Sequence, residues 1–437
     1  MTKSLAIVGA GPKAAAIVAR AAVLRELWPE REHPQIVVYE QVAPGSAWSG
    51  EAGYTSGLLQ LCSPAEKDIG FPYVETTGLD GDPTRSIAGE IFRRFSWNAF
   101  LVETGRFADW VDRGREPPPH AAWAHYIAWV FERAGQACTI AEVTRIARTG
   151  HGMWRITSRA GDVDNLLDSD GVVLTGTGDP RRVPERGEIP AQRIFDPADV
   201  WAARDLFLAG REKVVAVVGD GGAAGAVAAW LAPRLAERGS SLRSISPLGT
   251  LLPRGDGHAE RRWFTDPSDW RELSEPQRQT LLAHTESGVI SLRNKAVIDA
   301  ASNVEYAVGR AEGVRFELDE LLITIGYDRP SGDGGTVSMT RDVAADYLVN
   351  AMGFDPWSVL KIVRGKAQAL LADTPTARAL KRTTTSEMRA DLSLPPSSEV
   401  PDGLHVPGLC GLARGPGMPT LGCLGLVASA VLDGYVD

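Results

Sequence analysis

The sequence predicts an α/β protein with two domains of the same design, the second inserted into the first. Three observations lead to this fold class. A short apolar run that stops at glycine and continues into a helix-forming run occurs twice, at residues 5–14 and 214–224. Buried-strand patterns with small-residue ends recur at residues 171–178 and 347–354. The chain has 437 residues, of which 44% are hydrophobic, enough for two or three domain cores.

The first of the two stretches is built like a turn that binds a dinucleotide. After the apolar run at residues 5–8, Gly9 permits a tight turn. Gly11 lets a pyrophosphate approach the backbone, and Ala14 allows the next helix to pack closely on the strand. The amides and the dipole at the helix start favour a diphosphate. The predicted cofactor-binding residues of this turn are Gly9, Gly11, Pro12, Lys13 and Ala14. The alternative is a strand–helix turn without a ligand.

An acidic residue follows the second predicted strand. The strand at residues 35–39 ends in Glu40, close to the spacing at which a carboxylate binds a ribose hydroxyl. A turn-rich stretch, residues 44–50, comes next and contains Trp48. Irregular segments of this kind often carry ligand contacts. We therefore expect Glu40 and Trp48 to contact the cofactor.

The second stretch repeats the design with one change. Gly219, Gly221 and Ala224 hold the three fingerprint positions, with Gly222 between them. The strand that follows ends in Ser246 instead of an acid. A carboxylate would repel a 2′-phosphate, so its absence favours NADP over NAD. Either Arg243 or Arg254 could contact that phosphate, and either could equally be a solvated surface arginine.

Two such turns in one chain indicate FAD in the first domain and NADPH in the second. We expect the FAD domain to use residues 1–205 and 345–437, and the NADPH domain to occupy residues 206–344. The apolar segment 347–354 is read as the return to the FAD domain. Residues 304–340 alternate apolar and polar side chains and predict β-hairpins.

Composition excludes several classes of protein. The net charge of −9 argues against nucleic acid as a main partner. Four cysteines, without CxxC or metal-ligand spacing, favour a reduced cytoplasmic protein with inert thiols. We expect no signal peptide, because the chain goes directly into a strand, and no membrane span. The oligomeric state is left open.

Together these pieces resemble the flavin-dependent N-hydroxylating monooxygenases, in particular the mycobactin and nocobactin lysine N6-hydroxylases of siderophore assembly. The resemblance covers nearly the whole chain. Its specific parts are residues 9–14 (GAGPKA), 63–73 (SPAEKDIGFPY), 107–115 (FADWVDRGR), 264–270 (FTDPSDW) and 415–419 (GPGMP). It implies that FAD reduced by NADPH reacts with O₂ to a C4a-hydroperoxyflavin, which gives oxygen to the side-chain amine of L-lysine. No catalytic side chain and no metal are needed.

The resemblance also implies positions for contacts. Gln60 matches a glutamine beside the flavin, and Gly417, Thr420 and Leu421 match the C-terminal flavin segment. Lys67 matches the lysine that holds the substrate carboxylate, and Asn294 an asparagine near substrate and nicotinamide. Gly422 stands where the family has a serine.

Arg261 stands where the family has a substrate-binding asparagine. An arginine can bind a carboxylate through two hydrogen bonds, or it can indicate a different substrate or poor turnover of lysine. We therefore keep two alternatives: hydroxylation of ornithine, a diamine or another primary amine, and an uncoupled NADPH oxidase or ligand-binding flavoprotein.

Overall fold

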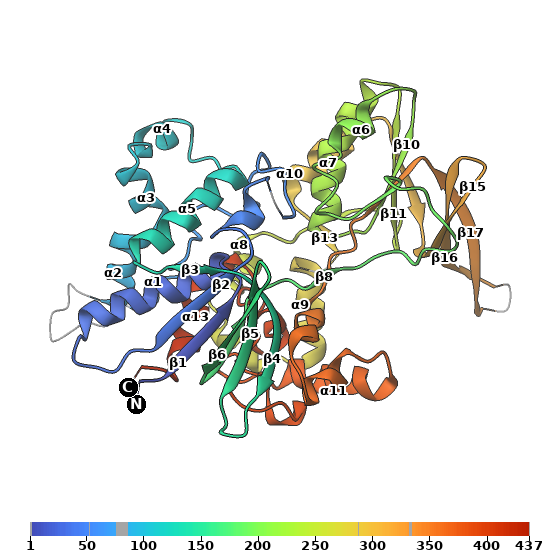
Figure 1. Cartoon of the computed structure of the whole chain (residues 1–437). Helices are drawn as coiled ribbons and strands as arrows, with labels where there is room; N and C mark the ends of the chain where they lie inside the picture. The colour runs from blue at the N-terminus through green and yellow to red at the C-terminus, as the bar shows by residue number, and fades with distance from the viewer. Residues whose placement is uncertain (1, 52, 76–85, 287, 332–333, 437) are drawn as a thin grey trace.

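The computed structural model describes residues 2–51, 53–75, 86–286, 288–331 and 334–436, which form two parallel sheets with helices around them (Figure 1). The first sheet has the strand order β20-β7-β1-β2-β3, and all its pairs are parallel. Its strands are β1 (Ser4–Val8), β2 (Gln35–Glu40), β3 (Cys138–Ile140), β7 (Gly171–Leu174) and β20 (Leu404–His405). The central strand β1 therefore carries the first glycine turn at its carboxyl end.

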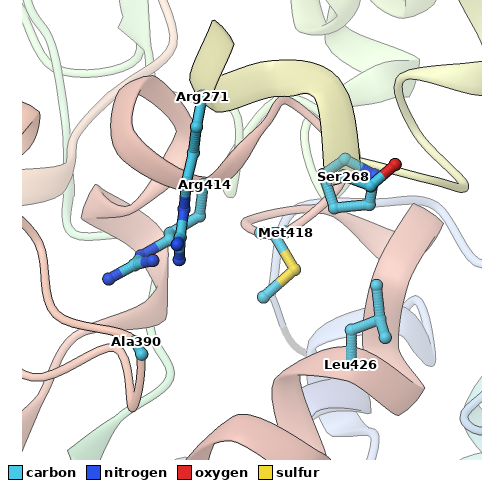
Figure 2. A pocket seen from close by; sticks show the side chains of 7 residues that line it. Ser268, Arg271, Ala390, Arg414, Met418 and Leu426 are labelled. Carbon is cyan, nitrogen blue, oxygen red and sulfur yellow. The ribbon is translucent and has the colours of Figure 1, made fainter.

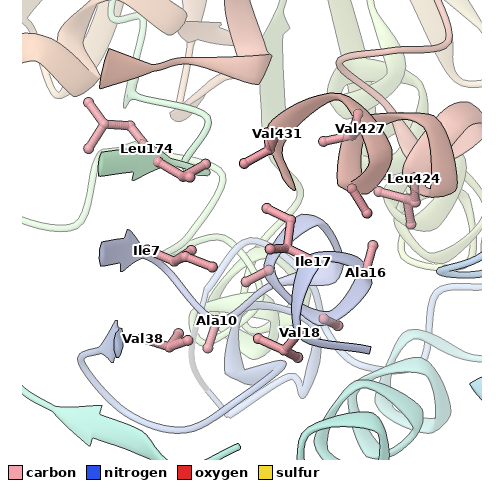
Figure 3. Packing of buried hydrophobic residues seen from close by; sticks show 14 of the residues in the cluster. Ile7, Ala10, Ala16, Ile17, Val18, Val38, Leu174, Leu424, Val427 and Val431 are labelled. Atoms are coloured by element: carbon pink, nitrogen blue, oxygen red, sulfur yellow. The ribbon is translucent and has the colours of Figure 1, made fainter. Parts of the chain in front are cut away.

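Two helices from opposite ends of the chain cover this sheet. α1 (Pro12–Leu27) begins at the glycine turn, and α13 (Leu424–Leu432) packs against it (Figure 3). The short side chains of Ala14, Ala15 and Ala16 are buried and let α1 approach its neighbours closely. The same core contains Ile7, Val38, Leu174 and Val427. Burial of this apolar surface fixes the C-terminal helix beside the first turn.

An aromatic core and a small antiparallel sheet complete the first region. Trp97, Phe100, Trp123 and Tyr126 are buried where the helices meet. The helices are α2 (Ile87–Phe95), α3 (Trp97–Glu103), α4 (Phe107–Asp112) and α5 (His120–Arg133). The antiparallel strands are β4 (Glu142–Arg148), β5 (Trp154–Ala160) and β6 (Val163–Ser169).

The second sheet has the order β14-β11-β10-β18-β9 and is also parallel. Its strands are β9 (Ile194–Phe195), β10 (Val214–Val218), β11 (Ser241–Ser246), β14 (Val304–Val308) and β18 (Tyr347–Asn350). Its helices are α6 (Arg204–Leu208), α7 (Gly222–Ala236) and α10 (Leu292–Asp299). An antiparallel sheet flanks it, made of β15 (Arg310–Glu317), β16 (Glu320–Pro330) and β17 (Thr336–Ala345).

Two of our expectations about this region are wrong. β18 does not return to the first sheet but pairs with β10, and β9, which we placed in the first domain, pairs with β18. The boundaries at 205 and 345 therefore cut the second sheet. The crossing points are instead β8 (Asp179–Pro180) and β19 (Phe354–Asp355), which pair with each other. The predicted hairpins begin at β15, because β14 pairs in parallel with β11. A buried apolar strand has the same pattern in either sheet, so the sequence does not distinguish them.

The remaining elements are short. Five of them follow β11 and precede α10 in the chain: β12 (Leu252–Pro253), α8 (His258–Arg262), η2 (Ser268–Glu272), α9 (Glu275–Thr285) and β13 (Val289–Ile290). The rest are η1 (Ser46–Trp48), η3 (Pro356–Ile362), η4 (Lys366–Leu371), α11 (Pro375–Ser386), η5 (Pro396–Ser398), η6 (Pro407–Leu409), α12 (Gly411–Arg414) and η7 (Leu421–Cys423).

Candidate active site

The first glycine turn has the geometry that a phosphate-binding turn requires. Gly9 has a φ of +96°, and a Cβ there would lie 2.5 Å from Thr175 Oγ1, so only glycine fits. A Cβ added to Gly11 would meet nothing within 4 Å, so the backbone faces open space. Ala14 is fully buried. The turn is thus closed toward the protein and open where a pyrophosphate would lie.

Glu40 lies beside this turn, as we expected. Its Oε2 accepts a hydrogen bond from Ala10 N at 2.9 Å, and its Oε1 accepts one from Gln41 N at 2.8 Å. It lines a cavity of about 420 Å³ at the carboxyl ends of β1, β2 and β7, together with Gly9, Tyr39 and Gly176. A cavity in this position fits the adenosine half of a dinucleotide.

Lys13, inside the turn, is half-buried. Burial lowers the pKa of its ammonium group, and the nearby Cys410 thiol opposes this effect.

A polar cluster joins the two regions of the chain at Gln60. Arg293 donates from Nη1 to Gln60 Oε1 at 2.9 Å and from Nη2 to Gln60 O at 3.2 Å. Arg293 precedes Asn294 on α10, so the structure brings the predicted flavin-side and nicotinamide-side segments together. Trp48 packs edge-on against His120, with ring centroids 4.8 Å apart. Burial and the positive charge of Arg293 lower the pKa of His120 to about 4, so this imidazole is neutral at pH 7.

Lys67 and Arg261 also come together. Burial is the main cause that lowers the pKa of Lys67, and Arg261 and Arg254 lower it further, while Cys423 opposes them. The Lys67 ammonium lies 5.3 Å from the centre of the Phe71 ring. Arg261 Nη2 donates to Asp256 Oδ2 at 3.0 Å, and 57% of its side chain stays exposed. The positive charges of Arg261 and Arg254 thus disfavour the charged form of Lys67.

The side chain of the C-terminal segment that faces this region is Cys423. Its thiol donates to Phe264 O at 3.2 Å, and burial raises its pKa to about 12, so it is protonated. Gly422, which we assigned to the substrate, is buried and donates its N–H to Thr420 Oγ1 at 3.1 Å. Thr420 caps η7, and Leu421 is its first residue. Gly417 allows close packing, because a Cβ there would lie 2.6 Å from Cys423 Sγ.

The second glycine turn repeats the geometry of the first. Gly219 has a φ of +137°, and a Cβ there would lie 2.2 Å from Ala351 O. Cβ atoms added to Gly221 and Gly222 would meet nothing within 4 Å, and Ala224 is buried. This turn also leaves space for a pyrophosphate at the start of α7.

The residues expected to recognise a 2′-phosphate have other partners. Arg243 lies in the middle of β11, and its guanidinium binds Glu305 and Ala344 O. Arg243 has a carboxylate partner, and its contact with a 2′-phosphate stays a prediction. Ser246 is buried and exchanges hydrogen bonds with Thr250 N and O. Arg254 is the better candidate for the 2′-phosphate, because its Nε is buried without a hydrogen-bond partner among the described residues.

Sequence reasoning missed Arg293 and His120, because neither stands in a recognisable motif. It treated Cys423 as an inert thiol, which agrees with its raised pKa but overlooks its place beside Lys67.

Within the described ranges, no three His, Cys, Asp or Glu side chains are arranged to hold a metal ion. No helix in those ranges has the length and apolar character needed to cross a bilayer.

The fold is that of the class B flavin monooxygenases, with a glycine turn at the carboxyl edge of each parallel sheet. The chain belongs to the L-lysine 6-monooxygenase/L-ornithine 5-monooxygenase family, whose model matches residues 92–318. It is 33% identical over 437 residues to the L-lysine N6-monooxygenase MbtG of Mycobacterium sp. (strain MCS), covering 99% of this chain and 95% of the relative. The identity to MbtG of Mycobacterium tuberculosis (strain ATCC 25618 / H37Rv) is 32%, with the same coverage.

Solved structures agree with this family. The lysine monooxygenase NbtG from Nocardia farcinica superposes with a TM-score of 0.78 at 28% identity, covering 98% of this chain and all of that one. The ornithine N-hydroxylase KtzI from Kutzneria sp. 744, with reduced FAD, NADP⁺ and L-ornithine, gives a TM-score of 0.71 at 15% identity, covering 100% of this chain and 99% of that one. The resemblance that the motifs indicated is confirmed.

Proposed function

We propose that this chain is an FAD- and NADPH-dependent monooxygenase that hydroxylates the side-chain amine of L-lysine for siderophore biosynthesis. The observation that carries the proposal is the cluster of Lys67, Arg261 and Cys423, which lies between segments of both regions. The relatives support the proposal, because the MbtG proteins are L-lysine N6-monooxygenases and are 32–33% identical to this chain over nearly its full length.

The chain has room for both nucleotides. FAD would lie at Gly9–Ala14 with its adenosine half toward Glu40, because Gly11 is open and a cavity follows. NADPH would lie at Gly219–Ala224, with Arg254 as the cation for its extra phosphate. Trp48, Gln60 and the segment Gly417–Leu421 would border the flavin. FAD, when bound, supplies the activation of O₂ with electrons that come from NADPH.

Lys67 would hold the α-carboxylate of the substrate with its ammonium group, with Asn294 nearby. The substrate amine must be neutral to attack an electrophilic oxygen. Burial and the charges of Arg254 and Arg261 already lower the pKa of Lys67, and the same surroundings favour the neutral form of a bound amine. Cys423 opposes this lowering, but burial is the larger cause, and the pKa of Lys67 stays below its usual value.

The role of Lys67 can be tested by the Lys67→Ala variant. We expect the KM for L-lysine to rise roughly tenfold to a hundredfold, because a partly buried charge-assisted contact contributes about 1.5–3 kcal/mol. Hydroxylamine formation and NADPH oxidation would be measured together. Cadaverine has no carboxylate and serves as the matched substrate, so its KM should not change. An unchanged KM for L-lysine would remove Lys67 from the site.

The same assay ranks the alternatives. Arg261 is a departure from the family pattern, so ornithine and putrescine belong in the panel beside lysine and cadaverine. A higher kcat/KM for one of them would replace L-lysine as the substrate. Peroxide release without hydroxylamine for every amine would favour the uncoupled oxidase.

A further inference from the structure

A surface cavity beside the segment Gly417–Leu421 has the chemistry of an anion site. It has a volume of about 340 Å³ and lies between η2, the segment after α11, α12 and α13. Its lining residues are Pro267, Ser268, Arg271, Ala390, Arg414, Met418 and Leu426. Figure 2 shows Arg271 and Arg414 on one side, and Met418 and Leu426 on the other. The cavity is thus cationic at one wall and apolar at the opposite wall.

Among the described residues, no carboxylate pairs with either of the two guanidinium groups at this cavity. Arg414 is held in place by Met388 O, at 2.7 Å from Nη2, and by Arg389 O, at 3.1 Å from Nε. Its Nη1 and the whole guanidinium of Arg271 form no hydrogen bond or ion pair with the part of the chain that the structure describes. Two like charges at one cavity repel each other unless an anion lies between them.

Three acidic side chains near the cavity have other partners. Asp269 pairs with Arg262 at 2.7 Å, and Asp266 accepts from Ser268 N at 3.0 Å. Asp391, beside Ala390, accepts from Ser393 N and Oγ. The positive wall therefore stays available to a ligand from solution. Guanidinium groups bind planar carboxylates well, through paired hydrogen bonds.

We propose that this cavity binds a small aliphatic carboxylate, with its charged group between Arg271 and Arg414 and its hydrocarbon chain on Met418, Leu426 and Pro267. The volume lies at the lower end of small-molecule sites, which suits a short chain. Inorganic phosphate shares the charge of such a ligand but cannot use the apolar wall.

The cavity is connected to the substrate cluster through two short segments. Met418 belongs to the loop that leads to Cys423, and Pro267 follows the Phe264 carbonyl to which Cys423 donates. A Cβ on Gly422 would lie 2.8 Å from Phe264 O, so the two segments are packed with little spare room. A ligand between Pro267 and Met418 therefore shifts the amine KM. This second step rests on the proposed function, whereas binding of the carboxylate does not.

The test is calorimetric titration of the full-length FAD-loaded protein with hexanoate and, separately, with inorganic phosphate. We expect saturable hexanoate binding that weakens about tenfold or more in Arg271→Glu, since a charge-assisted contact contributes about 1.5–3 kcal/mol. Arg271 is exposed, so this change leaves the fold intact. The matched control is Arg238→Glu, an exposed arginine of the second region that should bind hexanoate normally.

Two further variants distinguish binding in this cavity from binding at the substrate cluster. Lys67→Ala should bind hexanoate normally. If this variant lost hexanoate binding, the ligand would be assigned to the substrate cluster instead of the cavity. Leu426→Asp should weaken hexanoate more than phosphate. Absence of binding, or equal binding in Arg271→Glu, overturns the site. The KM for L-lysine is then measured with and without hexanoate. A change in the unaltered protein but not in Arg271→Glu supports the coupling between the cavity and the substrate cluster. An unchanged KM overturns the coupling and leaves the site.

Discussion

The two glycine turns share a backbone but differ in what the following strand contributes. Both begin with a glycine at positive φ, +96° at Gly9 and +137° at Gly219, and both leave open space where the helix starts. After β2, Glu40 is exposed to a cavity and accepts the N–H of Ala10. At the end of β11, Ser246 is buried and its hydroxyl exchanges hydrogen bonds with Thr250. In the proposed sites the glycines would meet the phosphates, and the residue at the end of the strand would set the charge that meets the ribose.

The largest effect is expected from Gly11→Val. The new side chain would enter open space, so the fold should persist while the pyrophosphate of FAD is blocked. We expect a colourless protein without monooxygenase activity, measured by flavin absorbance and by hydroxylamine formation. A yellow, active variant would mean that this turn does not bind the flavin.

Gly221→Val is the same change at the second turn and should separate the two sites. Its side chain also meets open space, so FAD should remain bound. NADPH-driven flavin reduction should fall by about a hundredfold or more, whereas reduction by dithionite should be normal. Stopped-flow absorbance measures both rates. Loss of flavin in this variant would contradict the assignment of separate ligands to the two turns.

Removing the side chain at the end of β2 should weaken cofactor binding, whereas removing the side chain at the end of β11 should not. Glu40→Ala leaves the Ala10 N–H without its acceptor, which costs about 1–3 kcal/mol, and should also weaken FAD binding. Ser246→Ala removes two hydrogen bonds of one turn, at about 1 kcal/mol, and should leave the KM for NADPH unchanged. Thermal unfolding with and without added FAD measures the effect of Glu40→Ala, and steady-state kinetics with NADPH measures the effect of Ser246→Ala. If both variants weakened binding of their cofactor equally, the proposed difference between the two turns would be wrong.

The smallest effect concerns the choice between NADPH and NADH. Arg254→Ala should lower the preference for NADPH about tenfold, because a charged contact to the 2′-phosphate is lost. Arg243→Ala is the matched control and should leave the preference unchanged, since its guanidinium is held by Glu305. That pair is partly exposed, so its loss should cost at most about 1 kcal/mol. The ratio of kcat/KM for the two nucleotides measures both variants, and a shift in Arg243→Ala alone would reverse the assignment.

Local features of the chain could be predicted because their causes are local. Gly9, Gly11, Gly219 and Gly221 were predicted from the fingerprint spacing. The structure gives Gly9 and Gly219 a positive φ and leaves open space beside Gly11 and Gly221. The resemblance to the family predicted Lys67 and Arg261 as substrate contacts, which stay predictions. These residues needed no knowledge of which strand pairs with which.

Features that depend on strand pairing could not be predicted. Glu305 reaches Arg243 because β14 pairs in parallel with β11, in a register that places the two residues opposite each other. The alternating pattern of residues 304–340 indicated a hairpin there instead. For the same reason β18 was assigned to the wrong sheet, and Arg293 at Gln60, 233 positions away in the chain, gave no sequence signal.

The pairing of β8 with β19 has a consequence for protein engineering. Pro180 and Phe354 are direct partners in an antiparallel ladder, so their Cα atoms are about 5 Å apart. A turn of about two residues can join such partners, and it would replace everything from 181 to 353. Every strand of the first sheet lies outside that stretch. We therefore expect that this pair is the place at which the second sheet can be removed or replaced, with the contacts of Phe264 and Trp270 to the first region restored.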